Sequence, residues 1–332
     1  MKKNYVFILL FFGAVVNSFA QTGPAGVGTS DGSIGPTNVL WLRSDAGVTE
    51  TGTVSAWADQ SGNGNDAAAP SGANEPIYVG TNGSFNNLPT LQFSAPSNDF
   101  RLVVPDADNL DNTSGVSVFM VLSPENITSG NVGILSKRTS FNGNQSYVYW
   151  QNNASLNSRI STGGAITSSS GLSAGTPTIF SSVANAGAVN QFIASTLNGS
   201  GTSGASVPNR ASDLFIGTFD DNAGETRNFE GDIAEIILFT EALNEAERII
   251  IENYLSEKYN ISIGASDYFS TGDNSFVNDL MGIGTADGTN KYSLSGFSDA
   301  LQLEESSGSL NSADEYALFA HDGTPHDQTV IT

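Results

Sequence analysis

The feature that most limits how this chain can fold is a repeated alternation of short apolar runs with turn-forming residues. Segments such as VSVFMVL (116–122), DLFIG (213–217) and IAEIILF (233–239) are rich in β-branched and aromatic residues, and Gly, Asn and Pro stand between them. Many such runs predict an all-β fold, a β-sandwich. The continuous apolar run IILF (236–239) indicates a strand that is covered on both faces.

One helix is expected to follow the last strand of the sandwich, over residues 244–259. Asn244 is a favourable N-cap, and Glu247, three residues further on, completes a capping box. The apolar stripe of this helix recurs at helical spacing and consists of Leu243, Ala246, Ile250 and Tyr254. We therefore expect a structural helix that packs its apolar side on the sandwich.

After Ile263 the pattern of strands and turns starts again, for example in MGIGTADG (281–288). The chain ends in a strand-like QTVIT (328–332) without a closing element. Residues 264–332 are few for an independent domain. The sequence therefore predicts a partial second β-rich domain at the end of a truncated chain.

The first residues have the features of an export signal. Lys2 and Lys3 precede a short apolar run, and SFA (18–20) is a small-x-small cleavage site. We expect a signal peptide over residues 1–20 that is cleaved after Ala20, and a secreted protein that is extracellular or on the cell surface. Residues 21–36, rich in Gly, Thr and Ser, predict a flexible leader before a domain of residues 37–263.

The charge balance limits the partners of the chain. There are 12 Lys+Arg against 34 Asp+Glu, a formal net charge of −22. Such a surface repels nucleic acid and anionic membranes, so we expect neither as a partner, and no later segment is apolar enough for membrane insertion. The charge suits divalent cations or neutral partners. Because there is no cysteine, an exported chain of this kind must rely on its core, with calcium as the one cofactor expected.

Several longer segments carry a resemblance to a known family. They are LWLRSDAGV (40–48), VSAWADQSGNGNDA (54–67) and FEGDIAEIILFTEALNEAERIIIENYLSEKYNI (229–261). Over residues 37–263 the chain resembles the laminin-G-like, concanavalin A-like modules of large secreted bacterial surface proteins. The resemblance implies a jelly-roll of two packed sheets, often with calcium at the rim of the sandwich. It also implies a glycan or a surface protein as the partner, in a role such as cell adhesion.

A candidate carbohydrate site lies in SYVYWQNN (146–153). On a strand, Tyr147 and Tyr149 share one face while Val148 and Trp150 share the other, so one pair faces away from the core. Aromatic rings cover the apolar face of a pyranose, and the neighbouring amides bond its hydroxyl groups. Tyr147, Tyr149 and Trp150 are therefore the predicted carbohydrate-binding residues, with ordinary core and edge packing as the alternative.

Two segments have the composition of metal sites. Oxygen-bearing side chains crowd the segment GTFDDNAGETRNFEGD (217–232), where the predicted calcium ligands are Asp220, Asp221, Asn222 and Glu225. A solvated turn is the alternative there. In AHDGTPHD, His321 and His326 stand with two Asp residues and could hold zinc, although an Asp-Gly turn explains the same letters.

The loop DQSGNGND (59–66) resembles the start of an EF-hand. Oxygen-bearing residues alternate at Asp59, Ser61, Asn63 and Asn65, with Gly64 in sixth place. The twelfth position should be Glu and is Pro70. We therefore predict a structural loop that follows a core anchor at Trp57, with a calcium contact at Asp59 or Asp66 as the alternative.

The motif E-x-D-x-x-E at Glu230, Asp232 and Glu235 also occurs in laminarinase-like glycoside hydrolases, which share the jelly-roll. A retaining hydrolase needs two carboxyl groups about 5–5.5 Å apart on one face. On a regular strand Glu235 would lie opposite the other two, and only a bulge would bring it round. The sequence thus favours a secreted, non-catalytic carbohydrate- or partner-binding module. A glycoside hydrolase using these three residues and a structural spacer remain the alternatives.

Overall fold

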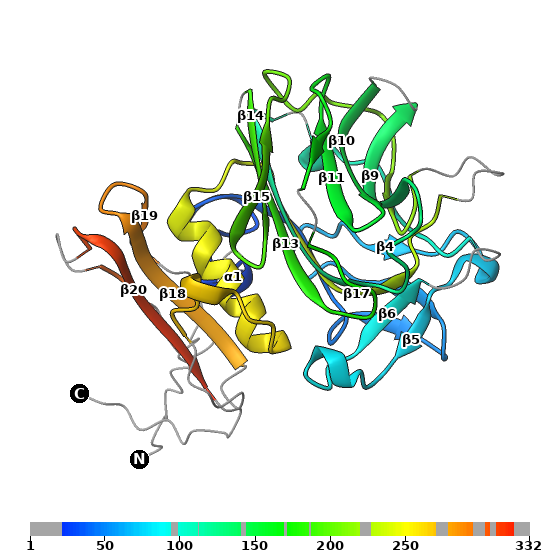
Figure 1. The fold of residues 1–332 in the computed structure, drawn as a ribbon, viewed down its shortest axis with the longest axis horizontal. Helices are drawn as coiled ribbons and strands as arrows, with labels where there is room; N and C mark the ends of the chain where they lie inside the picture. The colour runs from blue at the N-terminus through cyan, green and yellow to red at the C-terminus, as the bar shows by residue number, and fades with distance from the viewer. Residues whose placement is uncertain are drawn as a thin grey trace, which may run out of the picture.

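The computed structural model describes residues 22–93, 99–111, 113–140, 144–168, 171–185, 187–219, 227–269, 278–294, 303–305 and 310–321. The predicted signal peptide lies outside these residues. The described residues form an all-β, antiparallel jelly-roll sandwich with one α-helix and a small third sheet (Figure 1). The strand pattern predicts the β-sandwich, and the resemblance implies the jelly-roll.

The sheet that contacts the helix, here called the helix-side sheet, has eight strands. In spatial order they are β15 (Thr196–Gly201), β14 (Ala188–Ile193), β13 (Thr178–Asn185), β8 (Gly115–Pro124), β17 (Gly231–Phe239), β6 (Thr90–Phe93) and β5 (Ile77–Val79), with β1 (Asn38–Arg43) also paired to β17.

The opposite sheet, here called the far sheet, has nine strands. They are β12 (Ile166–Thr167), β11 (Ser155–Ile160), β10 (Asn144–Asn152), β9 (Val132–Ser140), β16 (Leu214–Ile216), β7 (Leu102–Val104), β4 (Ala67–Ala68), β3 (Val54–Trp57) and β2 (Val48–Glu50). The connections contain 3-10 turns at η1 (Pro24–Gly26), η2 (Gly72–Asn74), η3 (Gly83–Phe85), η4 (Asp108–Leu110) and η5 (Gly264–Ser266).

Two apolar clusters lie on the two sides of the helix-side sheet. On β8, Val118 and Met120 point into the core between the sheets, while Phe119 and Val121 point to the helix side. Every residue of β8 is buried. Strand β17 is divided in the same way, which confirms the expectation that its apolar run is covered on both faces.

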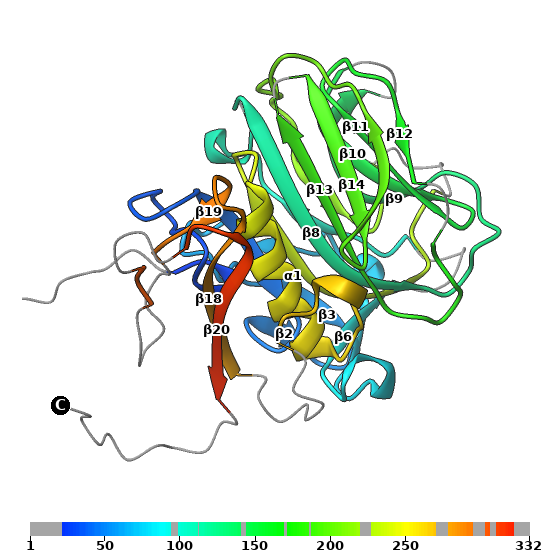
Figure 2. The same cartoon turned by 60° about the vertical axis from the view of Figure 1, so that its left-hand side comes forward.

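The helix α1 (Glu245–Tyr259) begins as predicted. The Asn244 side chain accepts a hydrogen bond from the Glu247 backbone at 3.1 Å, and the Glu247 carboxylate accepts one from the Asn244 backbone at 2.8 Å. Beyond this first turn almost the whole helix is buried, not only one stripe. The reason is that α1 lies between the sandwich and the third sheet (Figures 1 and 2).

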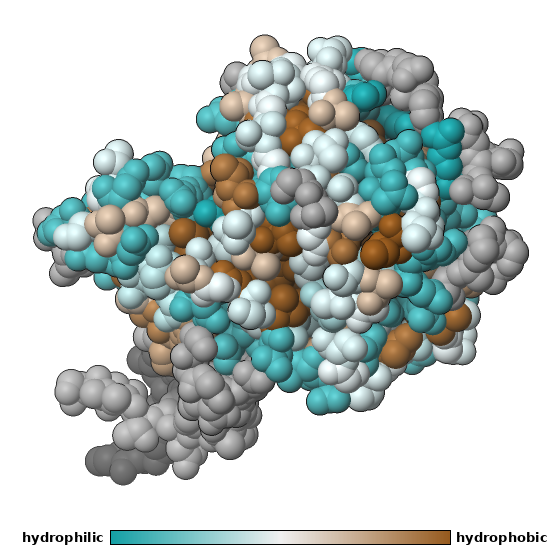
Figure 3. Space-filling view, in the orientation of Figure 1, coloured by the Kyte–Doolittle hydropathy of each residue, from teal (hydrophilic) through white to brown (hydrophobic). Residues whose placement is uncertain are grey.

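The third sheet consists of β19 (Lys291–Tyr292), β18 (Asn278–Asp287) and β20 (Ala313–His321). Leu280 and Tyr292 are buried in the cluster that also contains Ile250 and Tyr254 of the helix. The chain after Ile263 therefore packs on the sandwich through the helix. Figure 3 shows that the end of the third sheet that points away from the sandwich is mainly hydrophilic. Apolar residues appear in separate groups across the middle of the face of the molecule that is in view.

The expectation of a flexible leader is wrong for residues 22–36. Ala25 and Val27 are buried, and the Tyr292 hydroxyl donates to the Gly26 carbonyl at 2.7 Å. The backbone N–H of Gly28 in turn donates to that hydroxyl at 3.0 Å. Gly28 has φ +73°, and a Cβ there would lie 2.0 Å from the Pro36 carbonyl oxygen, so only glycine fits. The sequence predicts a flexible leader here because the few apolar residues of the segment have no period.

Within the described part of the chain, no helix is long and apolar enough to cross a membrane.

Candidate functional site

Strand β10 separates the predicted carbohydrate-binding residues onto two faces of the far sheet. Tyr147 and Tyr149 are both fully buried between the sheets. The Tyr147 hydroxyl donates to the Leu110 carbonyl at 3.0 Å, and the Tyr149 ring meets Phe180 edge to face, with centroids 6.0 Å apart. The prediction that these two tyrosines bind carbohydrate is therefore wrong, because the pleat of the strand points them into the core.

Trp150 points the other way and lines a pocket of about 200 Å³ on the outer face of the far sheet. Its indole N–H donates to the Asn131 side chain at 2.9 Å, which holds the ring in one orientation. Phe219 stands beside it, with ring centroids 6.4 Å apart and an interplanar angle of 50°. Val148 lines the same pocket. One wall of the pocket is thus apolar and carries a ring that is only partly buried.

The rest of the pocket lining is polar and basic. Gln145 and the three arginines Arg138, Arg159 and Arg227 belong to it. Arg159 lies opposite Val148 in the β10–β11 register, so it faces the same side of the sheet as Trp150. The guanidinium of Arg138 lies 4.5 Å from the centroid of the Phe219 ring, a cation–π distance. Sequence reasoning missed these arginines, because they come from separate segments of the chain and no local motif joins them.

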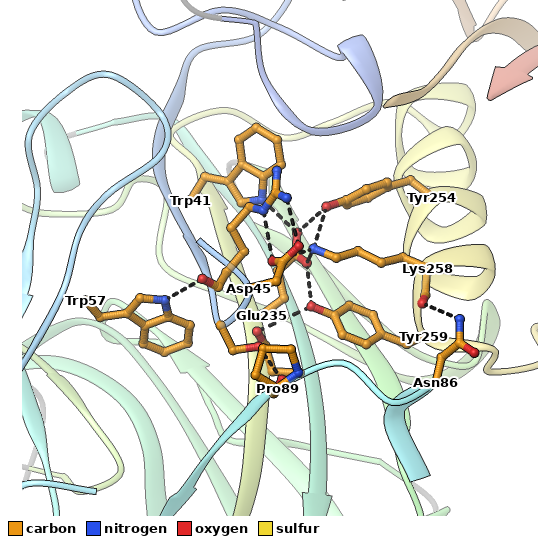
Figure 4. A network of polar contacts seen from close by, with 12 residues as sticks. Trp41, Asp45, Trp57, Asn86, Pro89, Glu235, Tyr254, Lys258 and Tyr259 are labelled. Carbon is orange, nitrogen blue, oxygen red and sulfur yellow. Dashed lines mark hydrogen bonds and ion pairs between the residues drawn. The ribbon is translucent and has the colours of Figure 1, made fainter. Parts of the chain in front are cut away.

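Glu235, named in the hydrolase alternative, is buried under helix α1 (Figure 4). Its Oε1 accepts hydrogen bonds from the Trp41 indole at 2.7 Å and the Tyr254 hydroxyl at 2.9 Å. Its Oε2 accepts from the Lys258 ammonium at 2.7 Å and the Tyr259 hydroxyl at 2.8 Å. Burial first, and then the charge of Glu235, raise the pKa of both tyrosines well above the usual value, so both remain donors. A carboxylate with four donors and no exposure cannot act on a substrate.

The expectation that Glu235 would face away from Asp232 is also wrong. The β8–β17 register shifts between Ile233 and Glu235, so β17 carries an extra residue, Ala234, at a bulge. Ile233 and Ile236 consequently both face the core between the sheets, while Ala234 lies in the helix-side cluster. The bulge turns Glu235 toward the helix, which then covers it.

Asp232 itself accepts a hydrogen bond from the Thr90 hydroxyl at 2.9 Å. Burial raises its pKa, and Glu125 adds to this effect, whereas the Thr90 hydrogen bond opposes it. Glu230 precedes β17, and its carbonyl accepts from the Glu125 backbone at 2.8 Å. A catalytic pair made of Glu230 and Asp232 stays an untested alternative to the predicted lack of catalysis.

The loop of residues 59–66 is hydrogen-bonded to β1 through Asp59. The Asp59 carboxylate accepts hydrogen bonds from the backbone N–H of Trp41 at 2.9 Å, of Ser61 at 2.8 Å and of Asn65 at 3.1 Å. The Ser61 hydroxyl donates to it at 2.7 Å. Trp57 is a buried core anchor, as predicted, and its indole N–H donates to the Arg43 carbonyl at 2.8 Å.

The predicted calcium ligands Asp220, Asp221, Asn222 and Glu225 lie outside the described residues, and so does His326. Of His321 only the backbone, at the end of β20, is described. Among the residues that the structure describes, no three of His, Cys, Asp or Glu are grouped so as to hold a metal ion.

No protein-family model matches this chain, and no curated protein matches it. Similar solved structures include Trypanosoma rangeli sialidase with the inhibitor DANA, at 16% identity and a TM-score of 0.47. They also include the binding domains of Paraclostridial mosquitocidal protein 1 and of botulinum neurotoxin serotype C1, each at 14% identity and a TM-score of 0.47.

The matches cover 70%, 64% and 66% of this chain and 34%, 51% and 52% of those structures, in the same order. The chain therefore spans between a third and about half of their length. Similarity of this degree gives no ground for transferring a ligand, so a functional conclusion has to rest on the pocket beside Trp150.

Proposed function

We propose that this protein is a secreted, non-catalytic carbohydrate-binding module of the laminin-G-like type, and that its ligand site is the pocket beside Trp150. The observation that carries the proposal is the Trp150 ring on the outer face of the far sheet, held by its hydrogen bond to Asn131. A fixed aromatic ring loses little conformational entropy when a sugar stacks on it.

The surroundings of Trp150 suit a sugar. Ligand pockets combine apolar and aromatic walls with a few convergent polar groups, and this pocket is lined by Val148 and Phe219 together with Gln145 and arginines. The amide and the guanidinium groups can bond the hydroxyls that the ring leaves free. The pocket is smaller than the roughly 300–1,000 Å³ of sites for drug-sized ligands. It therefore suits a single saccharide unit, with the remainder of a glycan in solvent.

The test compares Trp150→Ala with Tyr147→Phe on a glycan array and by titration calorimetry. Trp150→Ala should weaken binding of any glycan found for the unaltered protein at least tenfold. Tyr147→Phe removes a buried hydroxyl from the same strand, so it should lower the melting temperature and leave binding intact. Equal binding by the Trp150→Ala variant, or no glycan bound at all, would contradict the proposal. Capture of a surface protein instead would favour the partner-binding role.

A further inference from the structure

We infer that the pocket beside Trp150 selects an acidic sugar, a saccharide unit that bears a carboxylate or a sulfate group. This inference rests on the proposed function and specifies its ligand. It follows from three arginines that converge on a single pocket of a strongly acidic protein.

The charge of the pocket contrasts with the charge of the chain. The sequence has 12 Lys+Arg against 34 Asp+Glu, yet three of those basic residues, Arg138, Arg159 and Arg227, line this pocket. None of the described residues that line it is Asp or Glu. Clefts lined by one sign of charge concentrate field and attract ligands of the opposite sign. A neutral sugar would gain nothing from this positive electrostatic field, whereas an anionic sugar is attracted by it.

The three arginines come from different parts of the fold. Arg138 lies on β9, Arg159 lies on β11, and Arg227 belongs to the segment that precedes β17. Only the pairing of β10 with both β9 and β11 brings the first two together around Trp150. Guanidinium groups match carboxylate and sulfate oxygens through paired N–H donors, which an ammonium group does not offer.

Arg159 has donor capacity that the described protein does not use. Its Nε is buried without a hydrogen-bond partner among the described residues, and none of them forms an ion pair with it. Arg248, by contrast, pairs with Glu252 at 2.5 Å, and Arg43 pairs with Asp45 at 2.8 Å. Because Arg159 lines the pocket, an anionic group bound there can supply the ion pair that the described residues do not give it.

The test measures affinity by calorimetry for two matched pairs of oligosaccharides. Oligogalacturonate is compared with its methyl ester, and carrageenan oligosaccharide with its desulfated form, so the members of each pair share their sugar backbone and differ at the acidic group. We expect at least one acidic member to bind ten times more tightly than its neutral counterpart. We also expect its affinity to fall as salt is raised from about 50 to about 500 mM, because exposed charges are screened.

Variants assign the effect to the pocket. Arg159→Gln should lower the affinity for the acidic member at least tenfold, and Arg159→Lys should lower it less, since the charge remains but the paired donors are lost. Arg101→Gln removes an equal charge outside the pocket, so it should leave the affinity for the acidic member unchanged. Thermal melting checks that each variant is folded, and Arg159→Lys replaces Arg159→Gln if the latter is not.

The outcomes separate this inference from the function on which it rests. If the neutral members bind as tightly as the acidic ones, and Trp150→Ala abolishes that binding, the acidic specificity is wrong and the carbohydrate site stands. If none of the four saccharides binds, the inference is wrong for both kinds of acid. If, in addition, no glycan on an array binds, the proposed function falls as well.

Discussion

The Lys258 ammonium lies 2.7 Å from the Glu235 carboxylate, and both side chains are buried where helix α1 meets the helix-side sheet (Figure 4). Lys258 also contacts Asp45 at 3.1 Å, so one ammonium joins the helix to two parts of the sandwich. The acidic residue that sequence reasoning considered for catalysis is instead a polar anchor for the helix.

Replacement of Glu235 by Gln should destabilise the protein by about 3 kcal/mol, because removal of one partner leaves a buried charge poorly compensated. Urea denaturation measures this free energy of unfolding. Glu245→Gln is the matched control, since this side chain is 55% exposed on the same helix and should cost less than about 0.5 kcal/mol. An equal loss of unfolding free energy in the two variants would mean that the buried contacts of Glu235 stabilise the protein no more than an exposed carboxylate does.

The helix N-terminus should make stability depend on pH through Glu247. Burial raises the pKa of this carboxyl to about 7, although its hydrogen bond from the Asn244 backbone opposes the shift. The folded state therefore holds the proton more tightly than the unfolded state, whose pKa is 4.5. The stabilising contribution is complete below pH 4.5 and is lost as the pH rises toward about 7.

Glu247→Gln keeps the capping box and cannot titrate, so it should remove this part of the pH dependence. The measurement is the free energy of unfolding at several pH values between about 4.5 and 7.5. A variant with an unchanged slope over that window would show that Glu247 titrates normally.

Asp59→Ala should destabilise the protein by about 2 kcal/mol, because several donors of the 59–66 loop would lose their acceptor. Any calcium affinity measured by calorimetry should remain unchanged, since the carboxylate is already occupied by four hydrogen bonds. Asp66→Asn is the control, because Asp66 is exposed and accepts a single bond, from the Asp59 backbone at 2.8 Å. A loss of calcium affinity in Asp59→Ala would assign the loop to a metal site.

We propose that any calcium site involves the acidic segment from Asp220 to Glu225. Phe219 precedes this segment and Arg227 follows it, and both residues line the pocket. A cation that binds only the folded form raises the melting temperature with the logarithm of its excess. We expect calcium to raise it relative to EDTA, and Asp221→Asn to reduce the rise. An unmoved melting temperature would exclude the site.

The protein should not cleave β-1,3- or β-1,4-glucans, agar or carrageenan. A retaining pair needs two carboxyl groups in one open groove, and Glu235 is fully buried. The assay is release of reducing sugar over long incubation. Hydrolysis that disappears in Glu230→Gln would show that Glu230 works with another acid, for which Asp232 is the candidate.

Local features of the sequence were enough for the class of fold and for its helix. Alternating apolar runs predict strands because side chains on a strand alternate with period two, and the Asn244–Glu247 capping box acts within four residues. The burial of Trp57 also follows from its place in such a run. The burial of the leader could not be predicted from local sequence, because Ala25 and Val27 are buried by segments far away in the chain.

The sequence by itself determined the all-β sandwich, the helix that follows it and the acidic surface, since these depend on composition and on neighbours in the chain. Only the tertiary structure decided that Trp150, and not Tyr147 or Tyr149, faces outward, and that Glu235 lies under the helix. The physical reason is that strand register and bulges come from pairing between distant strands. A one-residue shift there moves a side chain to the opposite face.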